Sequence, residues 1–97
     1  MKVSVLVAVY NAEKYLRECL DSLINQTHRD LQIICIDDAS TDASWQILEE
    51  YARKDERIVL LKQLENRGQA EARNRGLLEA DGDFVTMLDS DDWFSLD

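Results

Sequence analysis

Apolar residues follow two different spacings along this chain, and the spacings alternate. Four short runs are almost continuously apolar, which is typical of strands that are covered on both faces in a parallel sheet; they are residues 3–9, 31–36, 58–61 and 84–88. Between them, apolar residues recur every three or four positions, as in amphipathic helices. These helices are expected over residues 12–24, 45–52 and 69–80.

The order of these elements predicts an α/β fold. Strand and helix alternate from the first run to the last, which favours right-handed crossovers and a mostly parallel, Rossmann-like sheet with helices on both faces. Asn11 is the expected N-cap of the first helix. Residues 54–57, which are all charged, are expected to form a solvated break before the third strand.

The third helix has an unusual pattern. One stripe has the spacing of a core face but carries polar residues in its middle: Ala70, Arg73, Asn74, Leu77 and Leu78. Beside it, a row of small residues at four-residue steps suits close approach of a helix to a sheet: Ala72, Gly76 and Ala80. A polar group on an inward face needs a partner. For Arg73, an ion pair with Asp37, Asp38 or Asp89 and contact with a phosphate both remain open.

The last predicted strand runs directly into three carboxylates, Asp89, Asp91 and Asp92. In extended backbone, Asp89 and Asp91 face the same side at about 7 Å separation. At an effective dielectric constant near 20, their charges repel by roughly 2.4 kcal/mol. A shared proton, a basic side chain or a divalent cation would neutralise them, and oxygen ligands of this kind suit Mg²⁺ or Mn²⁺. The cation would indicate a phosphate-bearing ligand, whereas a solvated acidic loop is the alternative.

Polar residues also close the first two predicted strands. Tyr10 and Asn11 follow one strand, and Asp37 and Asp38 follow the other. In an open parallel sheet, ligands bind at the edge where these strand ends meet. Tyr10 can lie against a nucleotide base, Asp38 can accept from a base N–H or a ribose hydroxyl, and a metal at Asp91 would hold the diphosphate. Alternatively, Tyr10 packs at a helix start. Asp37 points away from Asp38 and is expected to accept hydrogen bonds from the next turn.

Composition narrows the range of partners. The chain has 97 residues, of which 45% are hydrophobic and 32% charged, with a net charge of −9. It is therefore expected to be one soluble globular unit, and its charge argues against binding nucleic acid or anionic membrane surfaces. No run reaches the roughly 20 apolar residues of a membrane span, and no signal peptide is visible, so a cytoplasmic location is expected, with membrane association of a longer protein left open. Cys19 and Cys35 are expected in the core as thiols.

Six segments, taken in order, resemble the N-terminal half of the family-two glycosyltransferases; they are residues 3–11, 25–27, 36–42, 66–68, 72–76 and 88–92. The resemblance implies a GT-A fold with its strands ordered third, second, first and fourth. It also implies an inverting, metal-dependent transfer of a sugar from a nucleoside diphosphate sugar, UDP-linked by preference, to a hydroxyl of a glycan or lipid-linked acceptor.

The resemblance also assigns roles to individual residues. It implies that Tyr10 and Asp38 contact the nucleoside and that Arg73 lies near the donor. Asp89 approaches the ribose or the sugar, and Asp91, together with Asp89, holds Mn²⁺ or Mg²⁺. The general base is expected beyond Asp97, so no catalytic residue is nominated within the chain.

Three departures from the family pattern are visible. Ala8 stands where the family usually has proline, and Ala39 where it usually has glycine. The third is that the chain ends at Asp97, so residues 1–97 are expected to be the nucleotide-sugar-binding portion of a GT-A domain, truncated before the acceptor half and inactive alone. The edge of the strand at 84–88 would then be exposed, which favours self-association.

Three other functions remain open. A non-catalytic module could bind nucleotide and metal without an acceptor half. A phosphotransferase or phosphohydrolase could use an Asp-x-Asp nucleophile, but that motif usually follows the opening strand, which here ends in Tyr10 and Asn11. A receiver-like domain would need a lysine at a late strand end.

Overall fold

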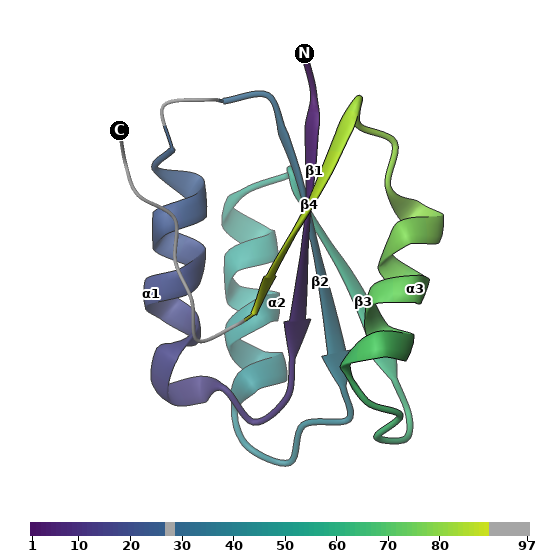
Figure 1. The fold of residues 1–97 in the computed structure, drawn as a ribbon. Coiled ribbons are helices and arrows are strands. Elements are labelled where there is room, and N and C mark those ends of the chain that lie inside the picture. The colour runs from purple at the N-terminus through teal and green to yellow at the C-terminus, as the bar shows by residue number, and fades with distance from the viewer. Residues whose placement is uncertain (27–28, 90–97) are drawn as a thin grey trace.

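Four strands form one parallel sheet in the computed structural model, which describes residues 1–26 and 29–89 (Figure 1). The strands are β1 (Val3–Val9), β2 (Leu31–Asp38), β3 (Ile58–Gln63) and β4 (Phe84–Asp89). The helices between them are α1 (Glu13–Ile24), α2 (Ser44–Lys54) and α3 (Gln69–Glu79). The strand order is β3-β2-β1-β4, which confirms the predicted fold class and the order that the resemblance implied.

Helices cover both faces of the sheet. α1 and α2 lie side by side on one face, and α3 lies on the other (Figure 1). Alternate residues of β1 and β2 point to opposite faces, so Val7 and Cys35 pack under α1 and α2, whereas Leu6 and Ile36 pack under α3. These central strands are almost fully buried, which explains why their sequences are continuously apolar.

The packing of α3 corrects one prediction and confirms another. The stripe expected to face the core is largely exposed, and Leu78 is 87% accessible to solvent. The row of small residues faces the sheet instead, with Ala72 and Gly76 buried. A Cβ atom added to Gly76 would lie only 2.8 Å from Ile36 Cδ1, so the missing side chain is what lets this helix approach the sheet so closely.

The start of α1 also differs from the prediction. The N-cap is Ala12 rather than Asn11, and no side chain of the N-cap residue accepts a hydrogen bond there. Asn11 adopts a left-handed conformation, with φ of 48°. It lies one residue before the cap, and its side chain contacts the loop that follows β2.

Both cysteines lie in the core, as expected. Cys19 and Cys35 are free and fully buried, and burial raises the pKa of the Cys35 thiol. Across residues 1–26 and 29–89, no helix is long and apolar enough to cross a bilayer.

β4 is an edge strand of the sheet that the structure describes, and Phe84, Val85 and Met87 are exposed on it. Self-association through this edge stays a prediction.

Candidate functional site

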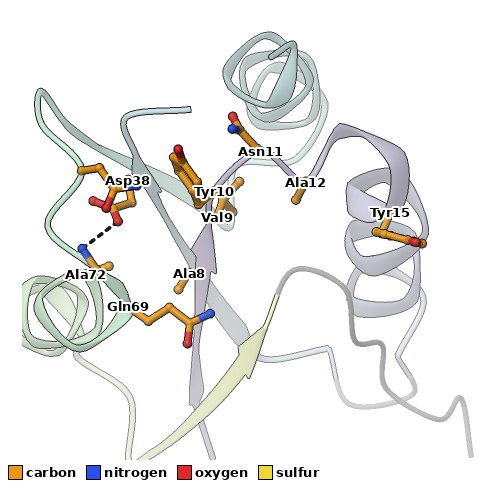
Figure 2. Close-up of a pocket in the computed structure, with 11 residues that line it drawn as sticks. Ala8, Val9, Tyr10, Asn11, Ala12, Tyr15, Asp38, Gln69 and Ala72 are labelled. Atoms are coloured by element: carbon orange, nitrogen blue, oxygen red, sulfur yellow. Dashed lines mark hydrogen bonds between the residues drawn. The ribbon is translucent and has the colours of Figure 1, made fainter. Parts of the chain in front are cut away.

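A pocket of about 340 Å³ opens at the carboxyl ends of the strands (Figure 2). It lies between the end of β1, the first turn of α3 and the first turn of α1. The residues that line it are Ala8, Val9, Tyr10, Asn11, Ala12, Tyr15, Asp38, Asn66, Gly68, Gln69 and Ala72. Two residues predicted to contact a nucleoside, Tyr10 and Asp38, are therefore brought to one cavity.

Asp38 is almost fully buried, with 4% of its surface exposed, and it organises one wall of the pocket. Its Oδ1 atom accepts hydrogen bonds from Gln63 Nε2 and from the Arg67 backbone N–H, both at 2.8 Å. Its Oδ2 atom accepts one from the Gly68 N–H, also at 2.8 Å. A carboxylate has about four acceptor positions. The three bonds therefore leave about one, on Oδ2, for a group in the pocket.

The loop before α3 is shaped to point its N–H groups at Asp38. Gly68 precedes the helix with φ of 90°, a conformation that favours glycine. This turn brings two successive N–H groups, from Arg67 and Gly68, to one carboxylate. Asn66 and Gln69, which flank Arg67 and Gly68 in the sequence, also line the pocket. Residues 66–68 stood in the sequence analysis as one of the segments that carry the family resemblance, and their contribution to the pocket was not predicted.

Tyr10 follows β1 directly and stands at the mouth of the pocket (Figure 2). Its side chain is 48% exposed. A residue that only packed against a helix start would be more deeply buried, so the exposure favours a ring available to a ligand. Tyr15, which the sequence suggested only as part of the first helix, lines the far end of the same pocket and is 44% exposed.

Of the two predicted metal ligands, Asp89 and Asp91, the structure describes only Asp89. Asp89 is the last residue of β4, and its backbone pairs with Ala8, whose side chain lines the pocket. The end of β4 therefore reaches the pocket edge. Asp91 lies outside the described residues. Across residues 1–26 and 29–89, no group of three or more His, Cys, Asp or Glu side chains is placed to hold a metal ion.

Arg73 and Asp37 have different positions from the residues above. Arg73 lies on α3, one turn beyond Gln69; it is partly exposed and is not one of the described residues that line the pocket. Asp37 is fully buried on the opposite face of β2 from Asp38. Its Oδ2 atom accepts a hydrogen bond from the Ser40 N–H at 3.2 Å, which confirms the predicted turn-capping role.

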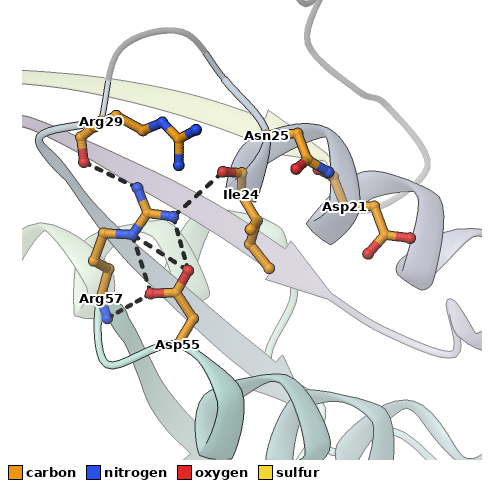
Figure 3. Close-up of polar contacts among 6 residues, drawn as sticks. All are labelled: Asp21, Ile24, Asn25, Arg29, Asp55 and Arg57. Atoms are coloured by element: carbon orange, nitrogen blue, oxygen red, sulfur yellow. Dashed lines mark hydrogen bonds and ion pairs between the residues drawn. The ribbon is translucent and has the colours of Figure 1, made fainter.

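A second polar cluster lies at the opposite edge of the sheet and corrects the expected solvated break (Figure 3). Asp55 and Arg57 form an ion pair of 2.7 Å, and their side chains are only 14% and 22% exposed. The Arg57 guanidinium also donates to the carbonyl oxygens of Arg29 and Ile24, so it ties the end of α1 to the start of β3. The hydrogen bonds that the Arg57 guanidinium donates to the Asp55 carboxylate keep the pKa of Asp55 below its usual value. The cluster is structural.

The same family emerges from comparison with known proteins. The profile described as Glycosyl transferase family 2 matches residues 4–97, and the chain therefore belongs to this family. Glycosyltransferase GlyA of Streptococcus pneumoniae serotype 4 is 49% identical over 99% of this chain, which is 14% of that protein.

Two solved structures share the fold. The crystal structure of S. aureus TarS 1-349 in complex with UDP-GlcNAc superposes with a TM-score of 0.89 at 40% identity, covering 96% of this chain and 27% of that one. Mannosyltransferase PcManGT from Pyrobaculum calidifontis, in complex with GDP-Man and Mn²⁺, has a TM-score of 0.88 at 30% identity, with 95% and 28% covered. The chain thus spans 14% to 28% of these three relatives.

Proposed function

We propose that the protein containing this chain transfers a sugar from a nucleoside diphosphate sugar to an acceptor hydroxyl, with inversion. The donor is UDP-linked and the acceptor is a glycan or a lipid-linked glycan. Residues 1–97 form the nucleotide-sugar-binding portion of its GT-A domain and transfer no sugar alone, because the general base lies beyond Asp97. The observation that carries this proposal is the pocket in which the Tyr10 ring and the unused acceptor position of Asp38 lie at one sheet edge.

The two side chains suit a nucleoside for different reasons. The exposed ring of Tyr10 offers an apolar face on which a base can stack. Asp38 offers a buried negative charge that accepts a hydrogen bond from a ring N–H or a ribose hydroxyl. Uracil and guanine carry a ring N–H on their pairing edge, whereas cytosine and adenine carry an unprotonated ring nitrogen there. Asp38 therefore favours uracil and guanine, in agreement with the nucleotides bound in the two related structures.

The acidic end of β4 fits a divalent cation. Asp89 and Asp91 supply carboxylate oxygens, the donor type that Mg²⁺ and Mn²⁺ prefer, and the backbone of Asp89 lies next to a residue of the pocket wall. A bound cation would neutralise negative charge on the departing diphosphate. Arg73 would lie near the donor on the α3 side, where its guanidinium can meet a phosphate oxygen.

Titration calorimetry on the full-length protein tests the proposal. We expect UDP to bind more tightly with Mn²⁺ than with EDTA, and CDP and ADP to bind at least tenfold more weakly than UDP. Tyr10→Ala should weaken UDP binding in both conditions, whereas Asp91→Asn should remove only the gain from Mn²⁺. Failure of UDP and GDP to bind would refute the proposal. Binding of UDP-sugars without turnover on any acceptor would instead identify a non-catalytic nucleotide-binding module.

A further inference from the structure

The loops that follow β1 and β2 meet beside the pocket, and both contain a residue in the left-handed conformation. Asn11 has φ of 48° and Ala39 has φ of 58°, and these are the described residues other than glycine with positive φ. Asparagine tolerates this conformation, but for alanine it is unfavourable and persists only where surrounding contacts hold it. The conformation of Ala39 therefore depends on the contacts that hold the two loops.

Reciprocal hydrogen bonds join the loops. The Asn11 N–H donates to Ser40 Oγ at 2.9 Å. In the other direction, the Thr41 N–H donates to Asn11 Oδ1 at 2.7 Å, and the Thr41 hydroxyl reaches the same oxygen at 3.3 Å. Both the backbone and the side chain of Asn11 are thus fixed by a segment about 30 residues away.

A buried residue of β2 also holds the β2–α2 loop in place. The Ser40 N–H is held by the fully buried Asp37 carboxylate. Directly after the loop, Ser44, the first residue of α2, accepts a hydrogen bond through its Oγ atom from the Ala12 N–H at 2.8 Å in a buried position. Asp42 Oδ2 accepts from the Glu13 N–H at 3.2 Å, so the first N–H groups of α1 are satisfied by the neighbouring loop. The β1–α1 loop is therefore held against a rigid support.

We infer that Asn11 and Ser40 are positioning residues for the donor pocket, because together they fix the direction of the Tyr10 side chain. Tyr10 lies between Val9, which is fixed in the sheet, and Asn11, which is fixed by Ser40 and Thr41. Its ring is half exposed, so packing holds it less firmly than the backbone does. This inference rests on the proposed function, in which Tyr10 stacks on the base of the donor.

The test measures UDP binding to the full-length protein in the presence of Mn²⁺. Asn11→Gly keeps the positive φ accessible but removes the Oδ1 acceptor, and Ser40→Ala removes the acceptor of the Asn11 N–H. Each should raise the Kd about tenfold, because a loosened Tyr10 must be ordered when the base binds. Ser40→Thr keeps the Oγ atom and should bind as the wild type does. We expect KM to rise with little change in kcat, since binding of the base is the same before and during transfer.

A matched control separates positioning from general stability. Tyr51→Phe removes another hydrogen bond between segments about 30 residues apart, from the Tyr51 hydroxyl to Asp21 Oδ1 at 2.7 Å, but away from the pocket. It should lower the melting temperature and leave the Kd for UDP within twofold of the wild type. If the loop variants lowered the melting temperature in the same way and bound UDP normally, the inference would be wrong.

A double-mutant cycle tests whether Asn11 acts through Tyr10. Once Tyr10 is replaced by alanine, Asn11→Gly should weaken UDP binding no further. If the losses of UDP affinity in the two single variants were fully additive in the double variant, the inference would be overturned and the proposed function would stand. The same conclusion would follow if Asn11→Gly bound UDP normally while Tyr10→Ala bound it weakly. If the wild type bound no nucleoside diphosphate, the proposed function would fail and the inference with it.

Discussion

The Asp38→Asn substitution tests both the structural and the ligand-binding role of this carboxylate. Asparagine keeps one oxygen, which will take the Oδ1 position because the donors from Gln63 and Arg67 both point there. The new amide group then faces the Gly68 N–H, which loses its acceptor. A donor left without a partner costs up to about 1–3 kcal/mol, and the Gly68 N–H is partly buried. The two remaining bonds lose their charge assistance, which costs roughly 0.5–1 kcal/mol more in total. The free energy of unfolding should therefore fall by about 1.5–4 kcal/mol.

The same substitution should weaken the binding of UDP. It replaces Oδ2, the atom with the unused acceptor position, by an N–H donor that faces the donor group of uracil. We expect the Kd to rise at least tenfold, which corresponds to about 1.4 kcal/mol. A separate measurement of affinity is needed, because a change in stability alone does not report on the ligand.

Urea unfolding and calorimetric titration measure the two effects of Asp38→Asn separately. Asp81→Asn is the matched control, since it makes the same chemical change at a side chain that is 64% exposed and forms an ion pair with Lys2. It should change the free energy of unfolding by less than about 0.5 kcal/mol. A wild-type urea midpoint for Asp38→Asn would refute the structural role of the carboxylate. Unchanged UDP affinity would show that Asp38 does not face the base.

Three further substitutions test the fold. Gly82→Ala should lower the free energy of unfolding by about 2–4 kcal/mol in urea, because its Cβ atom would lie 2.7 Å from the backbone nitrogen of Ser4; a wild-type midpoint would contradict this. Ala39→Gly should raise the melting temperature, because glycine relieves roughly 1 kcal/mol of strain at φ of 58°; a lower value would refute the role of strain. The hydrogen bond from Arg57 lowers the folded-state pKa of Asp55 below its ordinary value of 3.8, so its stabilisation is present above that pH and lost as the pH falls through the lowered pKa. Asp55→Asn should therefore reduce the loss of stability between pH 7 and pH 2, and an unchanged difference would count against the ion pair.

The strands could be predicted from the sequence because burial on both faces leaves a continuous apolar run. The orientation of α3 could not, because two rows along this helix have a suitable spacing. The row with larger apolar residues, including Leu77 and Leu78, suggested the core face. Contact distance decides otherwise: the sheet lies so close that a Cβ atom at Gly76 would meet Ile36. A pattern based on hydrophobicity counts the area that a residue can bury, whereas here the absence of a side chain determines which row packs.

The site was predicted as far as it depends on strand ends. Tyr10 and Asp38 stand at the ends of strands whose apolar runs are visible in the sequence, so a parallel sheet brings them to one edge, and both line the pocket. The partners of Asp38 were not predicted, since Gln63 and Gly68 lie 25 and 30 residues further along the chain. The contact of Asn11 with Thr41 spans 30 residues, and its separation explains why a local capping rule assigned Asn11 to α1 instead.

These long-range contacts have one physical origin. Where parallel strands end and helices begin, backbone N–H groups lose their regular partners and need acceptors. The polar side chains that satisfy them, such as Asp38 and Asn11, therefore stand at the edge where ligands bind. Substitutions of these residues must change stability and donor binding together. Tyr10, which is half exposed in the pocket, is the residue among the three at which binding should change while stability does not.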